Sequence, residues 1–172
     1  MRFFQVYQYG YSVSMAPLQE HFLRSILDAD VEGADFRRPD AFVQQWRLNG
    51  QHFAVYVLEP QGWKTHTVDG SVMVTVEVML YLRFLRQTIG TLFPTLKSGA
   101  VHFEFVQPLT TGTTAVLATY SFIVNTRGKI TSLLTNLQLL ESLRRVLRSL
   151  DNVVRLTEGT RIALDSGTIR LE

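Results

Sequence analysis

The side chains best suited to proton transfer in this sequence belong to His102 and Glu104, which stand two positions apart. If this stretch is a strand, both side chains lie on one face, where a carboxylate can orient an imidazole for acid–base chemistry. An exposed polar face explains the same spacing. We therefore keep His102 and Glu104 as a candidate polar pair and assign no catalytic residue.

The other histidines lack the spacing of a metal site. His52 and His66 fall in separate predicted hairpins, where Asp69 could join them as an oxygen ligand. No HxH or HExxH motif brings two imidazoles together. The chain also has no cysteine, which excludes thiolate zinc sites, iron–sulfur clusters and thiol nucleophiles. The sequence therefore predicts neither a metal centre nor a cofactor.

Motifs for nucleophilic catalysis and nucleotide binding are missing from the sequence. It contains no GxSxG elbow and no SxxK pair. The single glycine within residues 110–114 has no lysine after it, so this segment does not match a phosphate-binding loop. Enzymatic activity is therefore the less favoured hypothesis.

Arginines in the C-terminal part could bind carboxylates or phosphates through forked hydrogen bonds. Residues 128–172 hold seven basic and five acidic side chains, which accounts for the whole net charge of +2. This bias is too small to indicate nucleic-acid binding by charge alone, and a solvated helix face explains the arginines equally well. The candidate contact residues are Arg144, Arg145, Arg148, Arg155, Arg161 and Arg170.

Three alternating tyrosines, Tyr7, Tyr9 and Tyr11, stand out near the N-terminus. On a strand they would form an aromatic ladder that could stack bases or pack against a core or a second subunit. Only Arg2 is close in sequence, so the pattern favours packing over nucleic-acid binding. We expect these tyrosines to take part in a protein contact.

The elements that position these residues follow an α+β pattern. Alternating apolar residues predict strands over 2–12, 101–105 and 115–124, the last of them central in its sheet. The acidic segment 28–40 lacks periodicity and predicts an exposed connection.

Two dipeptides predict tight hairpin turns, because Asn49-Gly50 and Asp69-Gly70 tolerate the positive φ angles of a type I′ turn. The strands are expected over 42–48 and 51–58 for the first turn, and over 63–68 and 72–78 for the second. Beyond residue 78 two alternatives stay open. One is a short strand that runs into a helix ending near residue 92, and the other is one long helix from Ser71.

Helical spacing of apolar residues predicts a helix of about three turns over 17–27 and a longer amphipathic helix over 133–150. Apolar alternation after the second helix predicts a C-terminal three-strand meander over 154–171. Residues 130–172 would then form a helix–meander unit.

Composition places the chain among globular proteins, with 46% hydrophobic and 19% charged residues in 172. We expect a single α+β domain over 1–172, with an antiparallel hairpin-rich sheet, about three packed helices and the terminal meander. No apolar run reaches the ~20 residues of a membrane-spanning helix, and the first 14 residues do not resemble a signal peptide. These features predict an intracellular, cytoplasmic protein.

The exposed edge of a terminal meander can accept another strand. The leading hypothesis is therefore a non-enzymatic assembly or interaction protein that self-associates or joins a larger complex. It would use the N-terminal aromatic strand and the helix–meander unit. The alternatives are a nucleic-acid-binding module that uses the C-terminal arginines, and a small-molecule-binding domain or enzyme that uses His102 and Glu104.

Overall fold

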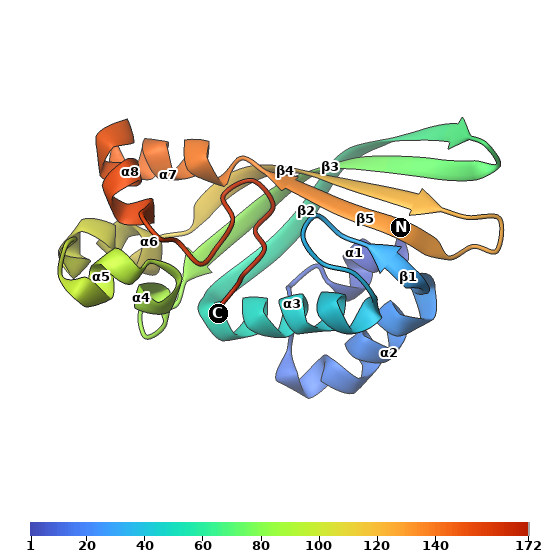
Figure 1. The fold of residues 1–172 in the computed structure, drawn as a ribbon, viewed down its shortest axis with the longest axis horizontal. Coiled ribbons are helices and arrows are strands. Elements are labelled where there is room, and N and C mark those ends of the chain that lie inside the picture. Colours follow the sequence, from blue (N-terminus) through green and yellow to red (C-terminus); the bar gives the residue numbers. More distant parts are fainter. Residues whose placement is uncertain (172) are drawn as a thin grey trace.

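A mixed five-stranded sheet organises the molecule, in a computed structural model that describes residues 1–171 (Figure 1). The strand order is β1-β5-β4-β3-β2; β1 runs parallel to β5, and the other neighbours are antiparallel. The predicted α+β class is confirmed, but the sheet is not antiparallel throughout. The strands are β1 (Leu27–Glu32), β2 (Phe53–Val68), β3 (Ser71–Phe84), β4 (Thr114–Val124) and β5 (Ile130–Leu137).

Alternation defines the inner face of the sheet. Every second residue of β4 is buried from Thr114 to Phe122, and the same holds for β3 from Val76 to Phe84. The β2–β3 hairpin turns at Asp69 and Gly70, whose φ angles of 48° and 81° match the positive values of a type I′ turn. The second predicted hairpin and the strand over 115–124 are therefore confirmed.

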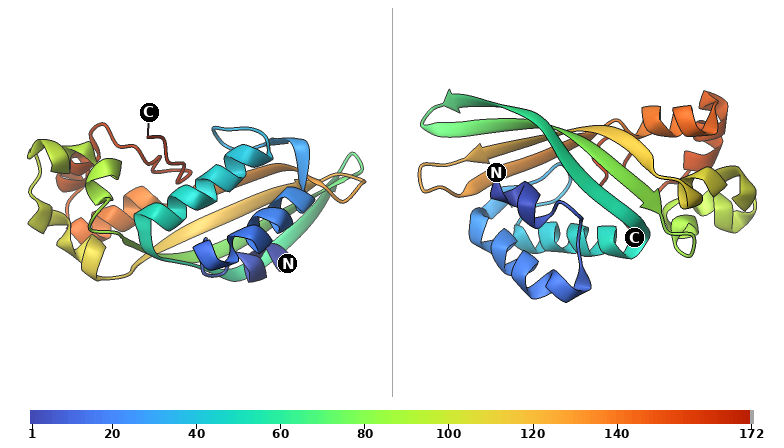
Figure 2. Two further views of the ribbon diagram at one scale, coloured as in Figure 1. Left: turned by 90° about the horizontal axis from the view of Figure 1, so that it is seen from below. Right: turned by 180° about the vertical axis from the view of Figure 1, so that it is seen from behind.

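Three N-terminal helices cover the inner face (Figures 1 and 2). They are α1 (Arg2–Val6), α2 (Ala16–Ile26), which follows the short 3₁₀ helix η1 (Val13–Met15), and α3 (Pro39–His52). Helix α3 begins with Pro39 at a position where its missing N–H costs nothing and carries Asp40 in its first turn. Its buried residues Phe42, Val43 and Trp46 recur at helical spacing, so the helix turns one apolar stripe toward the core.

The remaining helices gather at the other end of the sheet (Figure 1). Residues 158–171, here called the strap, leave α8 and run back along the sheet toward α3 (Figure 1). Within residues 1–171, no helix is both long and apolar enough to cross a membrane. The helices are α4 (Ile89–Leu92), α5 (Pro94–Ser98), η2 (Phe103–Val106), α6 (Gln107–Thr111), α7 (Leu139–Leu147) and α8 (Leu150–Thr157).

The predicted N-terminal strand over 2–12 is wrong, because Arg2–Val6 forms α1. Phe3 and Tyr7 are four residues apart, a spacing that fits one face of either a strand or a helix. The burial of Phe4 is incompatible with a strand that has one face in solvent. Adjacent residues of a strand point to opposite faces, yet Phe3 and Phe4 are both buried.

The predicted hairpin at Asn49-Gly50 is also wrong, because both residues lie inside α3. Burial of Trp46 and its neighbours on the helical stripe outweighs the turn preference of the dipeptide and the roughly 1 kcal/mol that glycine costs in a helix. Gly50 serves close packing instead: a Cβ there would lie 2.9 Å from Cδ1 of Tyr11.

The predicted helix over 133–150 is divided between two elements. Residues up to Leu137 form β5, and α7 begins only at Leu139. Leu133 and Leu137 fit both periodicities, again through a spacing of four. The predicted meander over 154–171 is wrong: α8 continues to Thr157, and the strap that follows contains only the isolated bridge between Ile162 and Ile169.

Three further predictions need correction. Strand β3 continues to Phe84, so neither the helix predicted from residue 78 to residue 92 nor the long helix from Ser71 forms. Residues 103–106 make η2 instead of a strand. The supposed exposed connection contains β1, whose Val31 is fully buried beside β5.

Candidate ligand cavity

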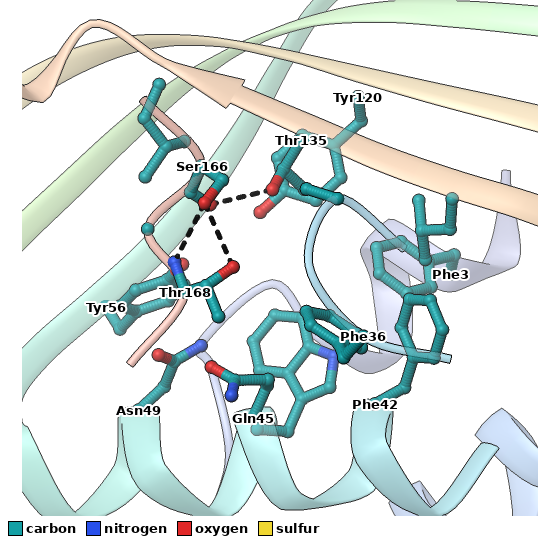
Figure 3. Close-up of a pocket in the computed structure, with 15 residues that line it drawn as sticks. Phe3, Phe36, Phe42, Gln45, Asn49, Tyr56, Tyr120, Thr135, Ser166 and Thr168 are labelled. Carbon is teal, nitrogen blue, oxygen red and sulfur yellow. Dashed lines mark hydrogen bonds between the residues drawn. The ribbon is translucent and has the colours of Figure 1, made fainter. Parts of the chain in front are cut away.

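A small cavity lies between the inner face of the sheet, helix α3 and the strap (Figure 3). Its volume is about 60 Å³, and fifteen residues line it. The sheet contributes Tyr56, Tyr120 and part of β5, while the strap contributes the segment from Ser166 to Thr168. The cavity therefore joins segments from both ends of the chain.

Aromatic rings form the helical wall of the cavity. Phe36, in the β1–α3 connection, meets Phe42 edge to face at 4.7 Å between ring centroids. Trp46 meets Tyr56 edge to face at 5.8 Å. Behind Trp46, the ring of Tyr7 stacks on the indole at 4.2 Å. Such contacts fix the ring planes, so the wall has a defined shape.

The strap closes the cavity through hydrogen bonds to α3 and β5. The side-chain amide of Gln45 accepts from the N–H of Ile169 at 2.9 Å and donates to its carbonyl at 3.0 Å. The hydroxyl of Thr135 donates to the carbonyl of Ser166 at 2.8 Å (Figure 3). At Gly167 the φ angle is +73°, and a Cβ would lie 2.5 Å from the side chain of Leu137, so glycine is required for this close approach.

Two tyrosines, Tyr56 of β2 and Tyr120 of β4, line the cavity from strands that β3 separates (Figure 3). Burial raises the pKa of Tyr56 to about 12 and raises that of Tyr120 well above its usual value, and the two hydroxyls influence each other. Both groups therefore remain protonated and uncharged near neutral pH. Phenols in this state can donate hydrogen bonds but are poor bases.

The cavity wall carries no ionic side chain: none of the fifteen lining residues is Asp, Glu, His, Lys or Arg. The nearby ion pair between Asp35 and Arg170, at 2.9 Å, ties the strap to the β1–α3 connection, and the hydroxyl of the lining residue Ser166 donates to the Asp35 carboxylate at 3.4 Å. The site can therefore select a ligand by shape and neutral hydrogen bonds.

The predicted tyrosine ladder is not formed, because its members diverge from α1. Tyr7 is fully buried and donates to the carbonyl of Gln19 at 2.9 Å. Tyr11 donates to Glu20 at 2.8 Å, and Tyr9 is 74% exposed. Only Tyr7 contributes to the cavity, indirectly, by supporting Trp46.

His102 and Glu104 do come close together, but on the surface. They line an open hollow of about 440 Å³ that Arg155 and Asn152 also border. Both members of the predicted pair are exposed, and no hydrogen bond joins them in the part of the chain described. The hollow and the aromatic cavity have no lining residue in common.

The candidate arginines do not act as one group. Arg144 forms a forked pair with Glu141, and Arg145 donates to the carbonyl of Ala115 at 3.1 Å. Arg148 ends α7 in a left-handed conformation, and Arg155 borders the surface hollow. The other two candidates, Arg161 and Arg170, belong to the strap, where Arg170 pairs with Asp35.

The histidines of the hypothetical metal site lie far apart along β2, because His52 precedes that strand and His66 stands near its distal end. Residues 1–171 contain no group of three potential ligands. His52 is buried, and burial lowers the pKa of its imidazole.

Comparison with known proteins identifies the fold. Residues 1–52 match the model of the bZIP transcription factor 1 C-terminal domain, whereas curated protein sequences give no match. TsrD from Streptomyces laurentii is similar in structure, with 11% identity, a TM-score of 0.54, and coverage of 85% of this chain and 92% of that chain. An NTF2-like protein of unknown function from Exiguobacterium sp. 255-15 has 12% identity, a TM-score of 0.50, and coverage of 78% and 92%. The chain has the NTF2-like fold.

A third similar structure is a protein provisionally named scytalone dehydratase from Novosphingobium aromaticivorans, with 12% identity, a TM-score of 0.50 and 79% of each chain covered. The predicted role as a non-enzymatic structural assembly component is wrong. Neither the aromatic strand nor the terminal meander on which that role depended is formed.

Sequence reasoning missed the cavity residues. Phe42 and Trp46 were placed in a strand, and Tyr120 in a strand with no assigned role. One signal was available: Tyr120 carries a polar group on a strand face between two apolar members, Ala118 and Phe122. Nothing in the sequence placed the strap opposite these residues.

Proposed function

We propose that this protein is a small-molecule-binding domain whose ligand occupies the aromatic cavity between the sheet, α3 and the strap. The observation that carries the proposal is the cavity itself, in which fixed aromatic rings meet hydroxyl groups of the sheet. Concave sites with apolar walls and a few converging polar groups are the usual form of small-molecule sites.

The lining favours binding over acid–base catalysis. General acids and bases work best when their pKa lies near the working pH, and these are most often histidine or carboxylate side chains. The fifteen lining residues include neither, and the pKa of Tyr56 is raised to about 12. The residues that match the bZIP transcription factor 1 C-terminal domain, 1–52, include those of the helical wall of the cavity.

The two tryptophans of the chain provide the test. Trp46 lines the cavity, whereas Trp63 is 62% exposed on the β2–β3 hairpin. A small uncharged aromatic compound such as phenol should shift the indole N–H resonance of Trp46 in a saturable manner and leave that of Trp63 in place. Phenol, toluene and acetophenone would be titrated in parallel, so that the result does not depend on one compound.

Specific binding has a second requirement, which is loss of the response when the cavity is filled. Thr135→Leu adds bulk on the cavity wall, and Ser132→Leu adds the same side chain elsewhere on β5, outside the lining. Saturable shifts that disappear only in T135L support the proposal. Absence of any saturable shift at Trp46 for all three compounds would contradict it.

A further inference from the structure

Exposed apolar side chains gather near the N-terminus. Five of the fifteen large hydrophobic side chains that are exposed within residues 1–171 belong to the first 18 residues: Met1, Tyr9, Val13, Met15 and Leu18. Val13 and Tyr9 are the two most exposed of the fifteen, at 86% and 74%. Single exposed apolar side chains are ordinary, whereas a group of them marks a surface that contacts a ligand or a partner. The first 18 residues therefore form a surface suited to binding.

A hollow of about 520 Å³ lies among these side chains, between α1, the connection that follows it and α2. Tyr9, Met15 and Leu18 line it together with Val6 of α1. None of its lining residues belongs to the sheet, and none lines the aromatic cavity. The N-terminal hollow is therefore a site of its own.

Gln19 fixes the floor of the N-terminal hollow. Its buried side-chain amide donates to the carbonyls of Val6 and Gly10, at 3.0 and 2.9 Å, and accepts from the N–H of Ser12 at 3.0 Å. Gly10 has a φ angle of +71°, and a Cβ there would lie 3.1 Å from Cβ of Tyr56, so this connection packs closely on β2. The floor therefore has its shape before any ligand binds.

The rim of the hollow carries one positive charge. Arg2 is the only charged residue of the lining, and no carboxylate within residues 1–171 forms a salt bridge with it. Its guanidinium lies over the ring of Phe22, 5.7 Å from the centroid, a contact that leaves the N–H edge available to an anion. The first acidic residue of the chain is Glu20, which is outside the lining and accepts two hydrogen bonds from Arg47. An anionic ligand therefore meets a cation and no opposing carboxylate in the lining.

We propose that the N-terminal hollow binds a carboxylate with a linear alkyl chain. The carboxylate pairs with Arg2, and the chain lies along Tyr9, Met15 and Leu18. A flexible chain suits this rim because the side chains of Met15 and Leu18 are exposed and methionine adapts to irregular apolar shapes. A flat bilayer surface would leave the hollow unfilled, so the proposed occupant is a single dissolved molecule. This site goes beyond the proposed function, since it shares no lining residue with the aromatic cavity.

Octanoate, octanol and octylammonium test the proposal, because they share one chain and differ in the charge of the head group. Each would be titrated into the intact protein below the concentration at which it forms micelles. The ε-methyl resonance of Met15 should shift in a saturable manner, whereas those of Met73 and Met79 on β3 should stay in place. Octanoate should bind about 2- to 5-fold more tightly than octanol, the factor expected for an exposed ion pair. Octylammonium should bind most weakly.

Two pairs of variants separate the charge from the apolar wall. Arg2→Gln should lower the affinity for octanoate to that for octanol and leave octanol unchanged. Arg86→Gln is the matched control, because Arg86 also lies over an aromatic ring, that of Phe103 at 4.5 Å, and is outside the lining. Leu18→Ala should weaken both ligands, whereas Leu117→Ala, at a position of similar exposure on β4, should weaken neither. The thermal midpoint of each variant shows whether the fold is retained.

A preference for octanoate at Met15 that R2Q removes and R86Q retains supports the proposal. Equal affinities for the three ligands, or a preference that R2Q retains, would overturn it. Shifts at Trp46 without shifts at Met15 would place the chain in the aromatic cavity, which overturns this proposal and leaves the proposed function intact. Absence of any shift at Met15 would also overturn it, and binding to phosphatidylglycerol vesicles in that case would identify a membrane surface as the occupant.

Discussion

Two hollows of this molecule differ in almost every physical property. The hollow beside His102 and Glu104 is open, charged and about 440 Å³ in volume. The cavity beside Trp46 is lined by several buried aromatic side chains, has no ionic lining residue and has a volume of about 60 Å³. The first contains the residue types that usually attract attention in a sequence. The second contains aromatic rings in fixed edge-to-face contacts and is bordered by the strap.

The difference shows that ionic residues are a weak guide to a site when they are exposed. The side chains of His102 and Glu104 are solvated, so their mutual interaction is weak. The aromatic cavity is lined by several buried side chains, and truncating a buried side chain removes packing contacts. We therefore expect substitutions at the two hollows to differ strongly in effect.

The largest difference should separate the two tryptophans. Trp46→Ala removes a buried ring that contacts Tyr7 and Tyr56 and should lower the free energy of unfolding by about 3–5 kcal/mol. Trp63→Ala removes an exposed ring and should change it by about 0.5 kcal/mol or less. Urea denaturation measures both values. Similar losses in the two variants would contradict the assignment of Trp46 to the cavity wall.

The next effect concerns the strap and its two glycines. Gly159 and Gly167 both have positive φ angles, 69° and 73°, so alanine costs about 1–2 kcal/mol of backbone strain at either position. Only at Gly167 would the new Cβ also meet Leu137, at 2.5 Å, whereas it would meet open space at Gly159. Gly167→Ala should therefore destabilise the protein more than Gly159→Ala and speed amide exchange at Ile169. Equal effects in urea denaturation and exchange would show that the strap does not pack closely on β5.

A smaller effect is expected from loss of the two hydrogen bonds between the Gln45 side chain and the backbone of Ile169. Gln45→Leu removes two hydrogen bonds between α3 and the strap and should cost about 1–2 kcal/mol. Gln44→Leu alters an exposed neighbour on the same helix and serves as the control, with a change of about 0.5 kcal/mol or less. Amide exchange of Ile169 reports the opening of the strap directly. If Ile169 exchanges at the same rate in Q45L and Q44L, the hydrogen bonds from Gln45 do not hold the strap in place.

The smallest effect is expected for the pH dependence of ligand affinity. Burial raises the pKa of Tyr56 to about 12, so its phenol stays neutral and acetophenone affinity should be constant between about pH 6 and 9. Because the folded-state pKa lies above the unfolded value of 10.0, the folded state holds this proton more tightly. The corresponding stability is complete below about pH 10 and is lost as the pH rises toward 12. A large change in affinity between pH 6 and 9 would indicate an ionic group in the site.

Several parts of the fold were accessible from the sequence. Asp69-Gly70 and the apolar run of β4 were recognised because turn chemistry and alternation there have no competing explanation. Leu133 and Leu137 were assigned to a helix because a spacing of four residues fits both periodicities. The prediction that a protein partner or a second copy binds this chain stays a prediction.

The site itself was less accessible. Trp46 was misplaced because the turn preference of Asn49-Gly50 was given more weight than the helical stripe that tertiary packing stabilises. The approach of Gln45 to Ile169 joins residues 124 positions apart, and no local pattern reports such a contact. Local preferences therefore identified individual elements, whereas the cavity depends on long-range packing.

The most direct test of the central claim is the measurement of intermolecular nuclear Overhauser effects between bound acetophenone and the protein. We predict contacts from the ligand protons to the rings of Phe42, Trp46 and Tyr120 and to the strap residue Thr168. Contacts confined to the surface near His102 and Arg155, in a sample with saturable binding, would contradict the assignment of the aromatic cavity as the ligand site.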